Sequence, residues 1–96
     1  MYWLLFYDVV DDYVERRAPL RGDHFDLLRA TQEAGHIVLA GALADPVDGA
    51  VVVFRGDDRS VAEEFVANDP YVKAGLVTSW RIREWTVVAG DALPPA

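Results

Sequence analysis

The sequence has 96 residues, enough for one compact domain and too few for two. Hydrophobic residues make up 52% and charged residues 26%, a composition that excludes intrinsic disorder. The chain has no cysteine and 2 histidines, which excludes disulfides, thiolate chemistry and a metal site built from cysteine or from three histidines. We therefore expect no metal ion and no cofactor.

The net charge of −7 comes from 9 basic and 16 acidic residues. Nucleic acid and anionic membranes attract the opposite charge, so neither is an expected partner. No apolar run approaches the roughly 18 residues that span a bilayer. The opening residues 1–7 are apolar, but they lack the basic start and the cleavage site of a secretion signal. These features predict a cytoplasmic protein.

An aromatic and branched run predicts a first strand over residues 2–9. Helical spacing then extends over residues 20–34. It follows Pro19, which suits the first turn of a helix, and it precedes Gly35, which suits the position after a helix end.

A second helix is predicted from the capping box formed by Ser60 and Glu63 to about residue 68, because Pro70 disfavours helical geometry at the residue before it. Residues 71–75 are expected to form a turn. Short apolar runs bounded by turn residues predict three more strands, over residues 37–43, 50–54 and 77–88.

This βαββαβ order predicts a ferredoxin-like α+β fold, with a four-stranded antiparallel sheet and two helices on one face. The fold forms one domain over residues 1–89, followed by a loose tail over residues 90–96.

The predicted strands are apolar on both sides, which is unusual for an antiparallel sheet with one face in water. In the first strand, Leu5 and Tyr7 point to one side, and Leu4 and Phe6 point to the other. Because two helices cover one face only, we expect the other face to be buried against a second copy, giving a homodimeric α/β barrel. The alternative is a monomer whose open face tolerates scattered apolar side chains.

His24 is the most informative residue of the first helix, because it shares an apolar stripe with Leu20, Leu27 and Thr31. A buried neutral imidazole needs a hydrogen-bond partner for each ring nitrogen. One interpretation is a core histidine bonded to a strand carbonyl, and the other is a histidine that performs chemistry.

Asp69 continues the inward face of the second helix, which is formed by Ala62, Phe65 and Val66. An aspartate is almost never fully buried unless it is paired. Because the two helices lie side by side on the sheet, Asp69 and His24 can meet at the end of their groove. A carboxylate on one imidazole nitrogen fixes the tautomer and aims the other nitrogen outward, as a general base requires. The alternative is a helix cap or turn residue before proline.

Arg21 lies one turn from His24, where a guanidinium can clamp a substrate carboxylate, with surface charge neutralisation as the alternative. For Arg16 and Arg17 the preferred interpretation is neutralisation of surface carboxylates, with substrate binding as the alternative. Gly41 interrupts a strand and indicates a close approach, either by a ligand or by a partner sheet.

Several segments together resemble the YciI-like (YCII-related) proteins, namely Arg21-Gly22-Asp23-His24, Ala40-Gly41, Asn68-Asp69-Pro70-Tyr71, Ala74-Gly75-Leu76 and Trp85. The resemblance extends to about residue 88. It implies a ferredoxin-like fold of the dimeric α/β-barrel type and an active site with a histidine and an aspartate, which correspond here to His24 and Asp69. Related proteins suggest elimination, such as dehydrochlorination, or isomerisation of small ring-derived acids.

The leading hypothesis is a cofactor-independent enzyme in which His24, oriented by Asp69, moves a proton on a small carboxylated ring substrate. Arg21, Tyr7 and Gly41 are the predicted substrate-binding residues. The rival hypothesis is a non-catalytic dimeric module that binds a small ligand or assists another enzyme. A third hypothesis is a heme-handling protein or monooxygenase of the same barrel, with His24 on iron or near a bound quinol.

Overall fold

The computed structural model describes residues 1–90, and its main elements follow the predicted order. The strands are β1 (Tyr2–Val9), β2 (Ile37–Ala42), β3 (Gly49–Arg55) and β4 (Val77–Trp85). The helices are α1 (Tyr13–Arg17), α2 (Arg21–Glu33), α3 (Ser60–Asn68) and α4 (Pro70–Lys73), with a 3₁₀ turn at Ala18–Leu20 between α1 and α2. The predicted tail lies outside the described residues from residue 91 onward.

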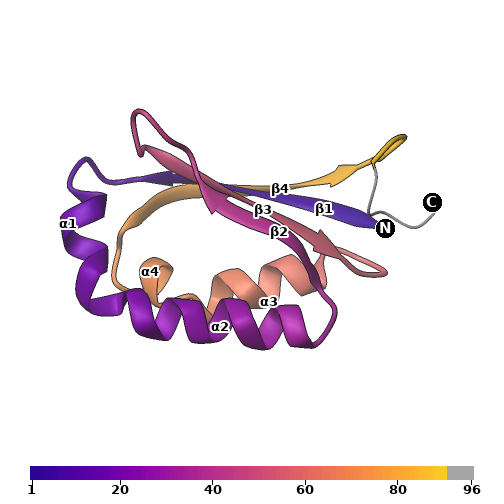
Figure 1. The fold of residues 1–96 in the computed structure, drawn as a ribbon, viewed down its shortest axis with the longest axis horizontal. Helices are drawn as coiled ribbons and strands as arrows, with labels where there is room; N and C mark the ends of the chain where they lie inside the picture. The colour runs from indigo at the N-terminus through magenta and orange to yellow at the C-terminus, as the bar shows by residue number, and fades with distance from the viewer. Residues whose placement is uncertain (91–96) are drawn as a thin grey trace.

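The strands form one antiparallel sheet of 4 strands in the order β2-β3-β1-β4. All labelled helices lie on one side of this sheet, with α2 running along the strands and α1 at one end (Figure 1). The arrangement confirms the predicted ferredoxin-like α+β fold. Within residues 1–90, no helix is both long enough and apolar enough to cross a membrane.

Two short helices, α1 and α4, were not predicted from the sequence. They contain 5 and 4 residues, too few to show a helical period. The start of α4 nevertheless has a clear local cause. Asp69 accepts a hydrogen bond from the Tyr71 backbone N–H at 3.0 Å, and Pro70 occupies the first helical position. The proline that ends α3 therefore also begins α4, where a turn was expected.

The predicted capping box at the start of α3 is wrong. Ser60 lies inside the first turn, and the residue at the cap position is Arg59, whose side chain makes no capping hydrogen bond. Asp58 instead accepts the backbone N–H of Ser60 at 2.8 Å. Because this short turn already pairs the first free N–H of the helix, the serine is not needed as a cap.

The last strand ends at Trp85, earlier than the predicted residue 88, for a reason set by pairing. Trp85 lies opposite Tyr2, the first residue of β1, so β1 offers no partner to the residues after Trp85. Gly35, with φ of 84°, ends α2 as predicted, because a residue with a side chain is strained in that conformation.

The main core lies between the sheet and the helices. Its buried side chains alternate along the central strands and meet the inward faces of the helices, and they are Leu5, Tyr7, Val52, Phe54, Ala62, Phe65, Val66 and Ile82. A second buried cluster of Tyr13, Tyr71 and Leu76 lies beside it and joins α1 to α4. The candidate site described below lies where these two clusters meet.

The opposite face of the sheet, which we call the helix-free face, is also apolar. By strand register it carries Leu4 and Phe6 from β1, Val51 and Val53 from β3, and Leu39 from β2. Leu39 is 69% exposed, and the Arg81 guanidinium lies 4.4 Å from the centre of the Phe6 ring. The prediction of strands that are apolar on both sides is confirmed.

Candidate functional site

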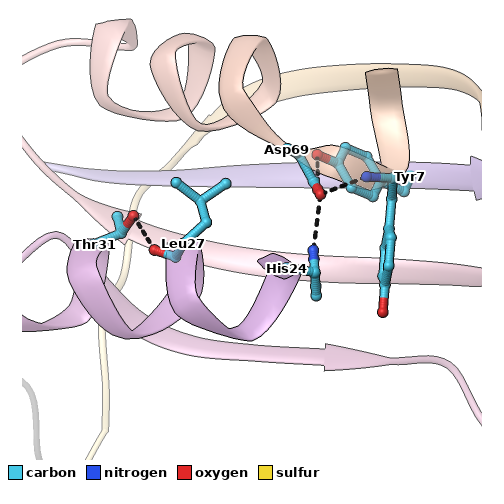
Figure 2. A network of polar contacts seen from close by, with 6 residues as sticks. Tyr7, His24, Leu27, Thr31 and Asp69 are labelled. Atoms are coloured by element: carbon cyan, nitrogen blue, oxygen red, sulfur yellow. Dashed lines mark hydrogen bonds and ion pairs between the residues drawn. The ribbon is translucent and has the colours of Figure 1, made fainter. Parts of the chain in front are cut away.

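His24 and Asp69 are in direct contact, as the helical spacing predicted. The His24 Nδ1 atom lies 2.8 Å from the Asp69 Oδ1 atom, across the gap between α2 and the junction of α3 with α4 (Figure 2). Pro70 forces Asp69 into an extended conformation (φ −71°, ψ 119°), and this directs the carboxylate away from the α3 helix. The side chain of His24 is 14% exposed, whereas that of Asp69 is 0% exposed.

The Asp69 carboxylate accepts three hydrogen bonds. Oδ1 accepts from His24 and from the Tyr71 backbone N–H, and Oδ2 accepts from the Tyr7 hydroxyl at 2.8 Å. Asp69 therefore serves both as the helix cap and as the partner of His24, which the sequence presented as alternatives. Three donors stabilise a buried carboxylate that would otherwise be strongly unfavourable.

Tyr7 lies on β1 and holds Asp69 from the side of the sheet (Figure 2). Burial, and then the neighbouring Asp69 carboxylate, raise the pKa of the Tyr7 hydroxyl well above its ordinary value of 10.0. Tyr7 therefore remains protonated at neutral pH and acts as a donor to the carboxylate. Its ring also lines the cavity beside the pair, where the sequence placed a substrate-binding residue.

The His24 ring is held in one orientation by aromatic neighbours. It stacks on the Tyr71 ring at 3.8 Å between centroids and 11° between planes, and Phe65 meets it edge-on at 6.3 Å. Because Nδ1 faces a carboxylate that can only accept, Nδ1 carries the proton and donates. In the neutral imidazole this tautomer leaves Nε2 as the acceptor, the form that a general base requires.

A cavity of about 250 Å³ opens beside His24. An apolar cavity of about 150 Å³ is enough for benzene, so this space accommodates one substituted ring. Its lining divides into an apolar part made by the sheet and α2, and a polar part made by the pair and its neighbours. The apolar part consists of Phe25, Leu28, Ala40, Ala42, Ala50 and Val52, and the polar part consists of Tyr7, Tyr13, Arg17, Arg21, His24 and Tyr71.

The arginines before His24 differ from one another in position. Arg21 lines the cavity, with its guanidinium 4.9 Å from the centre of the Phe25 ring. Arg16 lies outside the cavity and pairs with Asp12 at 3.6 Å, as expected. Arg17 also lines the cavity and makes no ion pair within residues 1–90, so its expected role as a surface neutraliser is wrong. Arg17 follows Tyr13 by one helical turn, and its guanidinium lies over the buried Tyr13 ring.

Gly41 contributes to the cavity wall through β2. It pairs with Val51, so a side chain at this position would project toward the helix-free face, where it would meet no atom within 4 Å.

His36 is exposed, and its Nδ1 lies 3.1 Å from the Arg55 carbonyl oxygen, away from the cavity. In the described part of the chain, no group of three or more histidine, aspartate or glutamate side chains is arranged to hold a metal ion.

Sequence reasoning missed Tyr13 and Tyr71 as site residues. Tyr71 directly follows the Asp-Pro pair, so its place next to the carboxylate was available as a signal. Tyr13 belongs to the short helix α1, lines the cavity and meets Tyr71 edge-on, at 5.6 Å between ring centroids. Such a contact between distant segments leaves no local pattern in the sequence.

These features define a ferredoxin-like α+β protein with a histidine–aspartate pair beside a small cavity. Residues 1–86 match the YCII-related domain, and the chain belongs to that family. A relative, an uncharacterised protein from Haemophilus influenzae, is 27% identical over 85 residues, which make up 79% of this chain and 87% of the relative.

Solved structures share the fold at low sequence identity. The 5-chloro-2-hydroxyhydroquinone dehydrochlorinase of Burkholderia phenoliruptrix AC1100, in complex with 2,5-dihydroxybenzoquinone, has a TM-score of 0.76 and 19% identity over 90% of this chain and 94% of its own. A NIPSNAP family protein of Agrobacterium tumefaciens has a TM-score of 0.61 and 12% identity over 97% of each chain. An antibiotic biosynthesis monooxygenase has a TM-score of 0.51 and 17% identity over 98% of this chain and 100% of its own.

Proposed function

We propose that this protein is a small cofactor-independent enzyme that eliminates a group from, or isomerises, a small ring-derived acid by proton transfer. His24 is the general base, and Asp69 orients it. The observation that carries the proposal is the contact of His24 Nδ1 with a carboxylate that is 0% exposed, beside a cavity of about 250 Å³.

The geometry supports proton transfer at one defined atom. Asp69 holds the His24 proton on Nδ1, so the Nε2 lone pair is available for a substrate proton. As Nε2 takes up that proton, the imidazole becomes positively charged, and the neighbouring carboxylate stabilises the charge. Tyr7 and the Tyr71 backbone N–H keep the carboxylate in place during this step. In elimination the electron pair of the broken C–H bond expels the leaving group, and in isomerisation the proton returns to another carbon.

The cavity supports a single-ring, anionic substrate. Its volume suits one substituted ring, and its sheet side is apolar. Arg21 supplies a positive charge at the polar end, where it attracts a substrate carboxylate. The dehydrochlorinase with a similar fold was solved with a hydroxylated ring compound, which agrees with this substrate class.

The helix-free face supports a homodimer as the working form. Two copies facing each other through Leu4, Phe6 and their neighbours on β2 and β3 would cover apolar side chains that the helices leave open. The missing side chain at Gly41 leaves room for the partner on this face. The sheets of the two copies would then form the barrel.

Replacement of His24 by asparagine tests the proposed function. We expect His24→Asn to keep the fold and to lower turnover by roughly 10²–10⁴-fold, because the ring removes the proton. Asp69→Asn should be nearly as harmful, since the amide can hold the ring in the wrong tautomer. The assay is turnover of hydroxylated or halogenated ring acids and lactones, with melting temperature measured in parallel.

His36→Asn is the matched control, because it replaces the other histidine away from the cavity. A His24→Asn protein that melts earlier but turns over substrate at the parent rate would contradict the proposal. If the parent protein binds ring acids and converts none of them, the non-catalytic binding module becomes the better description.

A further inference from the structure

Tyr13 and Tyr71 have buried rings, but their hydroxyls have no protein partner in the part of the chain that the structure describes. The residues are 3% and 2% exposed, and neither hydroxyl makes a hydrogen bond within residues 1–90. No fully enclosed polar side-chain atom in that part of the chain lacks a partner, so both hydroxyls keep some accessible surface. Both residues line the cavity. Phenylalanine would fill the same core positions, so packing alone does not explain the hydroxyls.

Tyr71 is the better placed of the two for chemistry. Its ring lies against the His24 ring at 3.8 Å, so its hydroxyl and the proposed base serve the same cavity. Arg17 and Arg21 line that cavity as well. Burial raises the pKa of Tyr71 above its ordinary value, and the two arginines act in the opposite direction without cancelling it. The hydroxyl is therefore a protonated donor at neutral pH, next to two positive charges.

We infer that the Tyr71 hydroxyl, with Arg17 and Arg21 around it, binds the oxygen anion of the substrate and stabilises the negative charge that develops there during proton transfer. The inference rests on the proposed function and specifies its substrate as a ring whose reacting carbon lies next to a carbonyl group. Tyr71 would be a catalytic residue that contacts this oxygen, and Arg17 would join Arg21 in substrate binding.

The step is balanced without a further reactant. The C–H bond at a tetrahedral ring carbon next to a carbonyl breaks, and its proton goes to His24 Nε2. The bonding electron pair forms a C=C bond, and the π pair of the C=O bond moves onto the oxygen. The oxygen becomes an enolate or phenolate, to which Tyr71 donates a hydrogen bond. A donor placed in advance at the atom where charge develops is commonly a large contribution to catalysis. Because Tyr71 also stacks on the His24 ring, this one side chain would position both the base that takes the proton and the oxygen that takes the charge.

The test is the binding of 4-nitrophenolate, a ring anion whose absorbance reports its protonation. We expect the parent protein to bind it as the anion and to bind nitrobenzene, the same ring without the oxygen, more weakly. Tyr71→Phe keeps the ring stack and should weaken binding of the anion roughly 10-fold, while binding of nitrobenzene changes little. Arg17→Gln should also weaken binding of the anion, and bound nitrophenol should ionise less readily in both variants.

Tyr2→Phe is the matched control, because Tyr2 is a buried tyrosine at the start of β1 that does not line the cavity. It should bind both probes like the parent protein. Unchanged binding of the anion by Tyr71→Phe would overturn the inference, and so would equal affinity of the parent protein for the two probes. The same titrations on His24→Asn separate this inference from the proposed function. Anion binding that depends on Tyr71 in that variant supports the site, whatever the outcome of the turnover assay.

Discussion

The two faces of the sheet are built from alternate residues of the same strands, yet the structure treats them differently. On one face, Leu5 and Phe54 lie beneath the helices and are 0% exposed. On the helix-free face, the neighbouring Leu4 and Phe6 remain partly exposed, and Leu39 is largely exposed. Strand alternation alone therefore does not decide burial. The helices account for most of the difference, because they cover one face only. Val53 is nevertheless buried on the helix-free face, at 8% exposed.

The difference explains where the candidate site lies. A buried carboxylate needs donors from several elements and the exclusion of water, and only the covered face offers both. Asp69 takes donors from β1, α2 and α4 at this place. The helix-free face carries Arg81 and apolar side chains, among them Phe6 and the largely exposed Leu39. The second copy that we propose would cover these side chains.

The largest expected effect comes from truncating a core ring on the covered face. Phe54→Ala should lower the free energy of unfolding by about 3–5 kcal/mol, because it opens a cavity among fixed neighbours. Phe6→Ala, on the other face of the sheet, should lower it by about 1 kcal/mol or less in dilute protein. Denaturant unfolding of both variants measures the contrast.

The concentration dependence of these losses sharpens the comparison. The loss from Phe54→Ala should stay constant as protein concentration rises, because the helices of the same chain cover the ring. The loss from Phe6→Ala should grow with concentration if a second copy covers that ring. Equal losses from the two variants in dilute solution would show that the comparison between the faces is mistaken.

The next effect in size concerns the proposed dimer. Phe6→Asp places a charge in the centre of the helix-free face and should weaken self-association by roughly 100-fold, since a partner would have to bury an unpaired carboxylate. Light scattering at micromolar protein concentration measures this. Val14→Asp, on the exposed surface of α1, is the control and should associate like the parent protein. A parent protein that stays monomeric over the whole concentration range would exclude the sheet-to-sheet dimer.

The sequence predicted the elements whose apolar pattern is long enough to show a period, such as β1 and α2, and it predicted that His24 and Asp69 would meet. Both residues stood out because polar groups on an inward face require partners. The partner Tyr7 lies 62 residues from Asp69, and nothing local indicates that its hydroxyl bonds the carboxylate. Arg17 was misplaced for a related reason, because its inward position depends on a helix of 5 residues that has no visible period.

The smallest expected effect concerns this Tyr7 hydroxyl. Tyr7→Phe removes one of the three donors to Asp69 and keeps the ring in the core. At neutral pH we expect the free energy of unfolding to fall by about 1.5 kcal/mol, the scale of a hydrogen bond to a charged group. Urea unfolding at pH 7 measures it. No loss at that pH would contradict the role of Tyr7 as a donor.

The same variant makes a prediction about alkaline pH, with a sign fixed by the pKa of Tyr7. Burial and Asp69 raise this pKa above 10.0, so the folded protein keeps the proton at pH values where the unfolded chain releases it. The stabilisation from this group is therefore complete below about pH 10 and is lost as the pH rises further, by up to about 1.4 kcal/mol per pH unit. Tyr7→Phe should lose stability less steeply over that range. Tyr71, whose pKa is also raised, contributes equally to both proteins. Parallel stability curves above pH 10 would show that the Tyr7 proton is not held by the folded protein, and Asp69 would then lack its donor from the sheet.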